Sequence, residues 1–126
     1  MSPPKKMTPL LNQLQFEALL RPGRPTSEDF FRVCAPIVGV AFGAEWCGPC
    51  KRLDKDKIVD DTPGVKWYYC DVDTNDYTLG YCGLQAIPSF VLILDGIFYT
   101  NRLSGASSEQ EVVNWVKTAI NKKVLK

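Results

Sequence analysis

Apolar residues cluster in four short runs that predict the strands of a sheet. Residues Ile37 to Phe42 form a nearly uniform apolar run with β-branched members, which is typical of a strand buried on both faces. A second strand of this kind is expected over Val65 to Val72. Two more, Phe90 to Leu94 and Ile97 to Leu103, are separated by Asp95-Gly96, a sequence that strongly favours a β-hairpin.

Capping residues and helical periodicity mark the segments around these strands. A helix from about Cys50 to Val59 is expected to stop at Thr62-Pro63-Gly64, and a short helix should cover Asn75 to Cys82. Ser108 and Glu111 form a capping box that begins the last helix. The expected buried stripe of that helix consists of Val112, Val113, Val116, Ile120 and Val124.

The N-terminal part of the chain is less regular. Residues 1–9 hold prolines and lysines with little to bury, and are predicted to form a flexible tail. Residues 10–20 fit either a helical stripe or the alternation of a strand, and we favour an edge strand over Gln15 to Leu20. Further on, Thr26 or Ser27 is expected to cap a helix. The apolar side chains that this helix would bury are Phe30, Phe31 and Cys34.

The order of these elements indicates an α/β fold. Strand and helix alternate over the first half of the chain, which favours parallel strands joined by right-handed crossovers, and the hairpin adds antiparallel strands. The sheet should therefore be mixed, with helices on both faces. A length of 126 residues fits one domain, which we place at residues 10–126, after the tail.

Composition excludes several classes of function. The sequence has 15 Lys and Arg residues against 14 Asp and Glu residues, a net charge of +1 that gives nucleic acids and anionic membranes no general attraction. No apolar run approaches the roughly 20 residues that cross a bilayer. The absence of histidine excludes Ser-His and Cys-His nucleophile pairs and zinc sites that need an imidazole. Any catalytic base must therefore be Asp, Glu, Lys, Tyr, Cys or water.

The five cysteines include one close pair, Cys47 and Cys50, separated by Gly48 and Pro49. If a helix begins near Cys47, Cys50 lies one turn later on the same face, close enough for a disulfide. Unpaired N–H groups at a helix N-terminus favour a thiolate, and Pro49 suits the first turn because it has no N–H. The pattern indicates a redox pair. The alternatives are a structural disulfide and a zinc site at Cys47, Cys50, Cys70 and Cys82.

Several motifs follow one another in an order that resembles the thioredoxin family. They are Ala44-Glu45-Trp46-Cys47-Gly48-Pro49-Cys50-Lys51 after an apolar strand, Asp71-Val72-Asp73 at the end of the next strand, Ile87-Pro88 before the hairpin and Gly105 after it. The similarity covers roughly residues 37–120. It implies the thioredoxin fold, a central mixed sheet of four to five strands flanked by helices on both faces.

The resemblance also implies roles for individual residues. Cys47 would be the attacking nucleophile and Cys50 the resolving thiol. Pro88 would be a cis-proline that faces the cysteines, although the sequence around it predicts a trans bond by itself. The other redox-motif residues are Trp46, Gly48 and Pro49. The residues expected to line the substrate groove are Trp46, Ile87, Gly105 and Ala106.

The activity implied by the resemblance is that of a protein dithiol–disulfide oxidoreductase, which reduces disulfides in protein substrates and serves electron transport and cell redox homeostasis. Electrons would come from NADPH through a flavoprotein reductase, with no cofactor or metal bound to this chain. The expected partners are the disulfide-containing substrates and the reductase, and the chain itself is expected to be a monomer. The alternative is a redox-inert module that binds a partner protein through the groove.

The sequence departs from the family pattern at four positions. Ala41 stands where a buried Asp is usual, and Tyr69 stands where the Lys partner of that Asp is usual. Gly43 replaces a Trp, and Lys55 replaces a helix proline. Loss of both members of a buried charge pair can leave stability nearly unchanged. The buried Asp is thought to relay the proton of the resolving cysteine, so its loss puts the second half of the reaction in question.

Most of the remaining cysteines and tryptophans are expected to pack in the core. Cys34 and Cys70 are interpreted as small apolar core residues, and Trp67 and Trp115 as packing residues. Cys82, at a helix end, is a candidate regulatory thiol that would form an intermolecular disulfide in a redox-dependent dimer. The charged residues after the redox motif are expected to form a solvated helix face; they are Lys51, Arg52, Asp54, Lys55, Asp56 and Lys57.

The N-terminal residues bear on the location of the protein. They are too polar for a secretory signal, and a cytoplasmic location is expected. Residues 1–16 contain no acid, and Arg21 and Arg24 follow them, so a mitochondrial presequence is the alternative.

Overall fold

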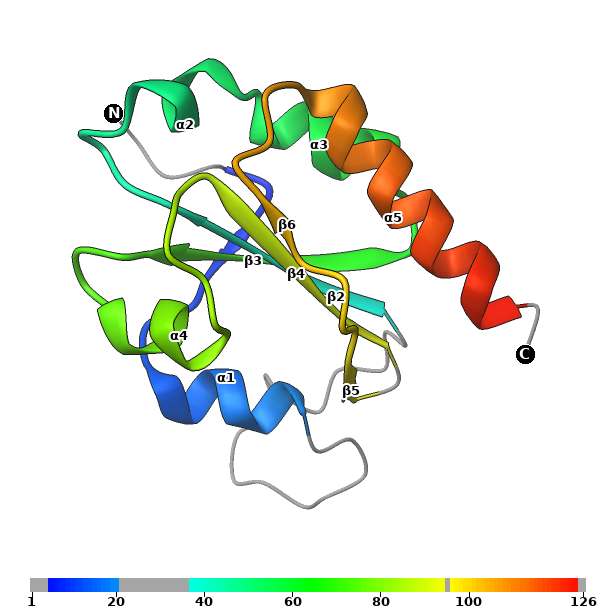
Figure 1. The fold of residues 1–126 in the computed structure, drawn as a ribbon, viewed down its shortest axis with the longest axis horizontal. Helices are drawn as coiled ribbons and strands as arrows, with labels where there is room; N and C mark the ends of the chain where they lie inside the picture. Colours follow the sequence, from blue (N-terminus) through cyan, green and yellow to red (C-terminus); the bar gives the residue numbers. More distant parts are fainter. Residues whose placement is uncertain (1–4, 21–36, 95, 125–126) are drawn as a thin grey trace.

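The computed structural model describes residues 5–20, 37–94 and 96–124 and has one sheet at its centre (Figure 1). The strands are β1 (Thr8–Pro9), β2 (Ile37–Gly43), β3 (Val65–Asp71), β4 (Ser89–Leu94), β5 (Ile97–Phe98) and β6 (Leu103–Ser104). The helices are α1 (Gln13–Leu19), α2 (Gly48–Arg52), α3 (Lys55–Asp61), α4 (Asp76–Tyr81) and α5 (Glu109–Val124). None of the helices in the described ranges is long and apolar enough to cross a membrane.

The sheet is mixed, which confirms the prediction, and has the strand order β1-β3-β2-β4-β5, with β6 also paired to β4. Strands β1, β3 and β2 run parallel, and β4 runs antiparallel to β2, β5 and β6. The described residues give six strands where four to five were expected, because β1 and the divided return arm of the hairpin, β5 and β6, contribute strands of two residues each.

Helices cover both faces of the sheet, so each face has its own core (Figure 1). On the face of α3 and α5, the core contains Trp67, Leu92 and Val112. On the face of α1 and α4, it contains Phe16 and Tyr68. Neighbouring residues Trp67 and Tyr68 enter opposite cores because side chains alternate along a strand.

The edge strand favoured over Gln15 to Leu20 is wrong, because this segment belongs to α1. The Asn12 side chain caps the helix by accepting a hydrogen bond of 2.9 Å from the Gln15 backbone N–H. Phe16 and Leu19 are buried, one helical turn apart, whereas Leu14 is 77% exposed. The apolar residues that resembled a strand therefore lie on different sides of a helix.

The predicted tail over residues 1–9 is also wrong in part. Met7 is buried, and Thr8 and Pro9 pair with Tyr68 and Tyr69 at the edge of the sheet. Proline is tolerated there because an edge strand need not donate from every residue. The helix expected after Thr26, together with Cys34, lies outside the described residues.

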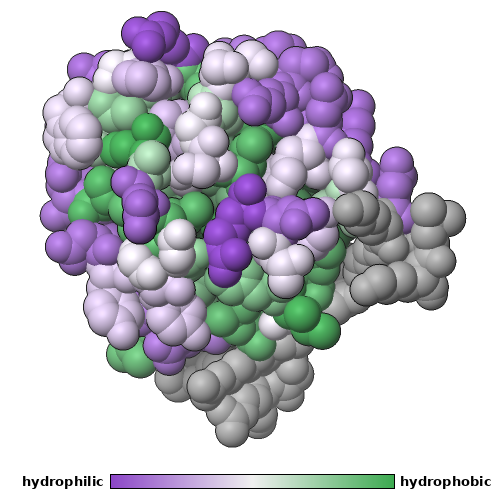
Figure 2. Space-filling view, in the orientation of Figure 1, coloured by the Kyte–Doolittle hydropathy of each residue, from purple (hydrophilic) through white to green (hydrophobic). Residues whose placement is uncertain are grey.

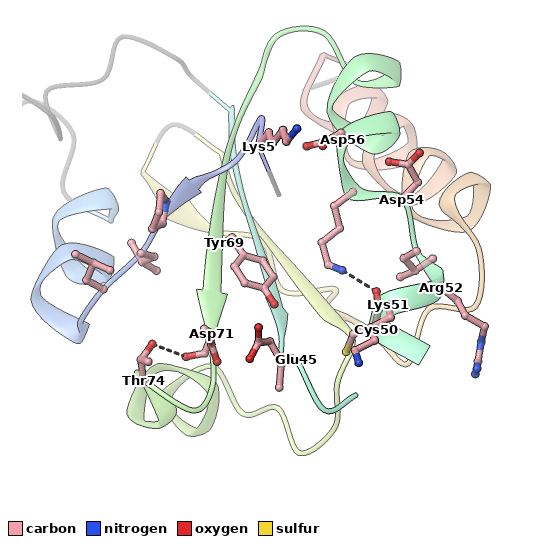
Figure 3. Close-up of a pocket in the computed structure, with 16 residues that line it drawn as sticks. Lys5, Glu45, Cys50, Lys51, Arg52, Asp54, Asp56, Tyr69, Asp71 and Thr74 are labelled. Carbon is pink, nitrogen blue, oxygen red and sulfur yellow. Dashed lines mark hydrogen bonds between the residues drawn. The ribbon is translucent and has the colours of Figure 1, made fainter. Parts of the chain in front are cut away.

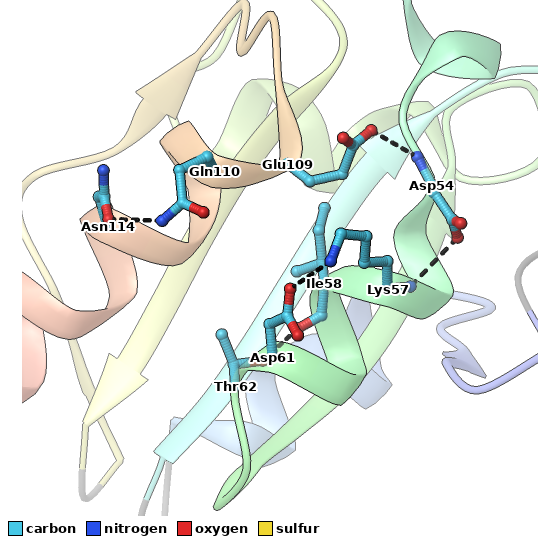
Figure 4. A network of polar contacts seen from close by, with 8 residues as sticks. All are labelled: Asp54, Lys57, Ile58, Asp61, Thr62, Glu109, Gln110 and Asn114. Atoms are coloured by element: carbon cyan, nitrogen blue, oxygen red, sulfur yellow. Dashed lines mark hydrogen bonds and ion pairs between the residues drawn. The ribbon is translucent and has the colours of Figure 1, made fainter.

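The single helix expected from Cys50 to Val59 is divided into α2 and α3. Leu53 adopts an extended conformation, and the Asp54 side chain starts the next helix by accepting a hydrogen bond of 3.1 Å from the Lys57 N–H. The Asp54 N–H donates to the Glu109 carboxylate at 2.9 Å, which ties the break to the start of α5 (Figure 4). The division places Lys55 in the first turn of α3, facing back toward α2.

The C-terminal helix confirms its predicted start and most of its predicted stripe. Ser108 accepts a hydrogen bond of 3.2 Å from the Glu111 N–H, while the Glu111 carboxylate accepts one of 2.9 Å from the N–H of Ser107. The members of the predicted stripe that are buried are Val112, Val113 and Val116. Ala119 is also buried, because it lies one turn after Val116 on the same face.

Candidate active site

Cys47 and Cys50 are joined by a disulfide at the N-terminus of α2, directly after β2, with their Cα atoms 5.2 Å apart. Cys47 is the N-cap residue of this helix, and its sulfur accepts a hydrogen bond of 3.1 Å from the Cys50 N–H. Pro49 lies in the first turn, where a missing N–H costs nothing. The strand, the cap and the proline together fix the position of the pair.

This arrangement favours a thiolate at Cys47 when the disulfide is reduced. A backbone N–H aimed at the sulfur stabilises negative charge more than it stabilises a neutral thiol. Cys47 is 4% exposed and Cys50 is 2% exposed, so little water competes for that hydrogen bond. Both cysteines are buried, and the Cys47 sulfur has a backbone N–H donor of its own.

The loop before β4 lies close to Cys47. The Ile87–Pro88 peptide bond is cis, and the Ile87 carbonyl oxygen lies 3.9 Å from the Cys47 sulfur. The Pro88 carbonyl accepts a hydrogen bond of 2.8 Å from the N–H of Gly105, which has a φ of 72°. The loop before β4 therefore lies beside Cys47, and Gly105 is tied to that loop through Pro88.

The residues predicted to line a substrate groove differ in how far they are exposed. Trp46 is 66% exposed, and its Nε1 donates to both carboxylate oxygens of Asp73, at 3.0 and 2.9 Å. Ile87 is half-buried, Gly105 is exposed and Ala106 is buried. Figure 2 shows apolar residues gathered on the side of α2 and the loop before β4, whereas the surface over α5 is largely polar. An apolar surface next to the disulfide is suited to contact a protein substrate.

A cavity of about 630 Å³ lies behind Cys50 (Figure 3). It contains Tyr69 on one wall, and Tyr69 pairs in the sheet with Ala41, which is fully buried. A Cβ atom added to Gly43 would lie 2.9 Å from the Tyr69 hydroxyl oxygen and 3.5 Å from the Cys50 sulfur. The glycine therefore leaves the space in which the hydroxyl approaches the redox pair. Burial raises the pKa of Tyr69 to about 12.

Lys55 also lines this cavity, and its burial corrects the prediction of a uniformly solvated charged face. Its Nζ donates a hydrogen bond of 2.7 Å to the Cys50 carbonyl oxygen, and the residue is only 6% exposed. Burial lowers the pKa of the Lys55 ammonium, while Asp54 and Asp56 act in the opposite direction. The available sequence signal was a lysine directly after the helix-capping Asp54, at a position where the family has proline.

The other cysteines of the described ranges lie in the core. Cys70 and Cys82 are both fully buried, which confirms the prediction for Cys70. Burial raises the pKa of each thiol to about 12. The proposal of a regulatory surface thiol at Cys82 is therefore wrong, because the helix end turns this side chain inward against the core of α1 and α4. Trp67 is buried and Trp115 is half-buried, as predicted.

The four-cysteine zinc site is not formed. Cys47 and Cys50 belong to a small cluster with Ala44, whereas Cys70 and Cys82 lie in the core on the face of α1 and α4. Within the part of the chain that the structure describes, no group of three or more cysteine or acidic side chains is placed to hold a metal ion.

Comparisons with known proteins agree with this geometry. The family model named Thioredoxin matches residues 26–118. Thioredoxin from Geodia cydonium is 34% identical over 73 residues, which make up 56% of this chain and 69% of that protein. Mitochondrial thioredoxin-3 from Saccharomyces cerevisiae is 32% identical over 92 residues, 71% of this chain and 63% of that protein, which is less than two thirds of its length.

Solved structures have the same fold. The crystal structure of thioredoxin from Trypanosoma brucei brucei superimposes with a TM-score of 0.74 over 95% of this chain and 96% of that chain, at 20% identity. Oxidised mitochondrial thioredoxin 3 from Saccharomyces cerevisiae gives a TM-score of 0.71 over 89% of this chain and 94% of that chain, at 26% identity. The mixed sheet with flanking helices is therefore the thioredoxin fold.

Proposed function

The chain belongs to the thioredoxin family and is a thiol–disulfide oxidoreductase that reduces protein disulfides, and from this premise we propose that Cys47 attacks the substrate and Cys50 releases it. The hydrogen bond from the Cys50 N–H to the Cys47 sulfur supports this order most directly. It gives Cys47 the stabilised thiolate, and thiolates are the attacking species in disulfide exchange.

The reaction then consists of two exchanges. The Cys47 thiolate attacks one sulfur of the substrate disulfide and forms a mixed disulfide, while the other substrate sulfur leaves as a thiolate and takes up a proton. Cys50 loses its proton and attacks the Cys47 sulfur, which forms the Cys47–Cys50 disulfide and releases the second substrate thiolate. Two electrons pass from the dithiol to the substrate.

Substrate contact is proposed for the surface around the pair. Trp46, Ile87, Pro88, Gly105 and Ala106 would receive an extended segment of the substrate on either side of its cysteine. The nearness of the Ile87 carbonyl to the Cys47 sulfur and the exposure of the Trp46 ring support this assignment.

An insulin-reduction assay with dithiothreitol tests the proposed order. We expect the wild type to accelerate reduction and Cys47→Ser to abolish the acceleration. Reduced Cys50→Ser, incubated with insulin after dithiothreitol is removed, should accumulate a mixed disulfide that mass spectrometry maps to Cys47. Cys82→Ser is the matched control and should retain the activity. A wild type that adds nothing to the rate with dithiothreitol alone would support the redox-inert interaction module instead.

The source of electrons is proposed to be NADPH, delivered by a thioredoxin-reductase-like flavoenzyme. The family relationship supports this proposal, since the disulfide must be reduced again after each turnover. Oxidation of NADPH in a mixture of this protein, a thioredoxin reductase and insulin would measure it. Oxidation that does not depend on this protein would argue for another reductant.

A cytoplasmic location and a monomeric state are proposed for the working protein. The Saccharomyces cerevisiae relative is named as mitochondrial, which keeps a mitochondrial location as the alternative. Imaging of a C-terminal fluorescent fusion, and sedimentation of the oxidised and reduced protein, would test the two proposals separately.

A further inference from the structure

Three of the four positions that depart from the family pattern, Gly43, Lys55 and Tyr69, lie beside Cys50, and the fourth pairs with Tyr69 in the sheet. Ala41 and Tyr69 are paired across β2 and β3. Gly43 leaves the space between the Tyr69 hydroxyl and the Cys50 sulfur. Lys55 reaches the Cys50 carbonyl from the first turn of α3. The replacements therefore form one local arrangement around the resolving cysteine, in place of the buried carboxylate that would otherwise take its proton.

Among the charged residues whose burial the structure describes, Lys55 alone is buried. A buried ammonium is costly unless it has partners. Its hydrogen-bond acceptor is the neutral Cys50 carbonyl, and its Nζ also lies 5.8 Å from the centre of the Tyr69 ring. No carboxylate of residues 5–20, 37–94 or 96–124 takes this direct hydrogen bond, so within these ranges the positive charge is not cancelled at close range and acts on the neighbouring groups.

Other charged groups face the same cavity from several elements. The acidic ones are Glu45 after β2, Asp71 at the end of β3, and Asp54 and Asp56 around the start of α3. The basic ones are Lys5, Lys51 and Arg52. Asp54, Lys5, Lys51, Arg52 and Glu45 are exposed, and Asp56 and Asp71 are half-buried. Solvent therefore screens them more than it screens Lys55, which leaves Lys55 as the dominant charge next to Cys50.

We propose that Lys55 is a positioning residue for the second exchange: its ammonium, held at the Cys50 carbonyl, stabilises the thiolate that Cys50 must form. This inference rests on the proposed role of Cys50 as the resolving thiol. In the mixed disulfide, the Cys50 thiol loses its proton to water in the cavity. The resulting thiolate attacks the Cys47 sulfur, the new disulfide forms, and the substrate leaves as a thiolate that water protonates. No further oxidant or reductant is required.

The first experiment measures Cys50 without turnover. In a Cys47→Ala background, the Cβ carbon of Cys50 is followed by NMR against pH, with Lys55 intact and with Lys55→Met or Lys55→Gln. We expect both substitutions to raise the pKa of Cys50 by about one unit, which is a tenfold smaller thiolate fraction at a pH below that pKa. Gln keeps a hydrogen-bond donor without the charge, so an effect shared by Gln and Met belongs to the charge.

Two variants serve as controls. Lys57→Met removes an exposed lysine of the same helix, which pairs with Asp61 (Figure 4), and should leave the Cys50 titration unchanged. Lys55→Arg keeps the charge and should keep the pKa of Cys50 closer to that of the parent. Thermal unfolding of each variant shows whether the fold is intact, and Lys55→Gln replaces Lys55→Met if the latter does not fold.

The second experiment follows release of an aryl thiol from its mixed disulfide with Cys47, by stopped-flow. Lys55→Met and Lys55→Gln should slow release about tenfold at neutral pH and move the pH profile upward, whereas the first exchange at Cys47 should be little changed. An unchanged Cys50 titration in both folded variants would overturn the proposal, as would an equal shift in Lys57→Met. A wild type that fails to reduce insulin would instead contradict the proposed function, since the Cys50 titration does not depend on turnover.

Discussion

One backbone N–H group distinguishes the two redox cysteines. It belongs to Cys50 and points at the Cys47 sulfur, because the cap of α2 places residue 47 just outside the helix and residue 50 in its first turn. Charge on Cys47 is stabilised by a group that does not titrate. Charge on Cys50 depends instead on Lys55, a group that does titrate and that is attached to a different helix.

The reduced protein should be alkylated at Cys47 before any other described cysteine. Cys47 has the stabilising N–H, whereas Cys70 and Cys82 are buried thiols whose pKa is raised to about 12. Iodoacetamide near neutral pH, followed by mass mapping, should label Cys47 at least tenfold faster than either core thiol.

Alkylation of the unfolded protein provides the control for this prediction. In urea, Cys47, Cys70 and Cys82 should react at similar rates, since the differences come from the folded environment. Labelling of Cys70 or Cys82 first in the native protein would contradict the assignment of Cys47 as the nucleophile.

The sequence identified the redox pair but not the residue that we place behind it. Cys47 and Cys50 were recognisable because the spacing, the preceding strand and Pro49 are local features. Lys55 was not, because a lysine among alternating charges is most simply interpreted as solvated. Its burial depends on the interruption of the helix at Leu53 and on the approach of Tyr69 from another strand. Neither can be inferred from the local sequence pattern.

Elements with a cap and an unbroken pattern were predicted well. Strand β2 and helix α5 are found where the apolar run and the capping box placed them. Helix α1 was missed because its short sequence satisfies both periodicities, and the Asn12 cap and the packing of Phe16 decide between them only in the folded chain. Tertiary contacts decide such ambiguous segments.

Strand packing makes a prediction about Gly39. In β2, a Cβ added to Gly39 would lie 2.6 Å from the ring of Trp67, which is buried and held by a hydrogen bond of 2.8 Å to Thr62. The ring cannot move away, so Gly39→Ala should lower the free energy of unfolding by about 1–3 kcal/mol. Urea unfolding monitored by Trp fluorescence would measure the change.

Gly80 in α4 is the matched control for this substitution. Its added Cβ would meet no atom within 4 Å, and alanine favours a helix more than glycine does. Gly80→Ala should therefore raise the free energy of unfolding by about 0.5–1 kcal/mol. If both substitutions destabilised the protein equally, the packing of Gly39 against Trp67 would not be the cause.

At the scale of the whole molecule, the sheet separates two cores and brings the site to one of its ends. The redox pair follows β2, Asp73 follows β3, and Pro88 precedes the antiparallel strand β4, so all three loops lie at the same end (Figure 1). The core on the side of α1 and α4 contains Tyr68, Cys70 and Cys82, whose side chains carry protons that they would lose at high pH. The free energy of unfolding of the whole molecule should therefore depend on pH in the alkaline range.

We expect the oxidised protein to lose stability as the pH rises above about 9. Burial raises the pKa of Cys70 and Cys82 from 9.0, and that of Tyr68 and Tyr69 from 10.0, to about 12. At a pH between the ordinary pKa of each group and its raised pKa, the folded chain holds protons that the unfolded chain has lost, so the free energy of unfolding falls as the pH rises. Lys55 acts in the opposite direction, because its pKa is lowered, but it is one group against four.

The size and origin of this alkaline loss can be measured by urea unfolding between pH 7 and pH 11. The loss should be on the order of 3 kcal/mol by pH 11, with little change from pH 6 to pH 8, since the sequence has no histidine to titrate there.

Cys82→Ala should make the slope above pH 9 shallower, because it removes one buried thiol. Tyr77→Phe is the control and should leave the slope unchanged, because Tyr77 is 65% exposed. A stability that stays constant to pH 11 would mean that the folded chain does not hold the protons of these buried thiols and tyrosines more tightly than the unfolded chain does.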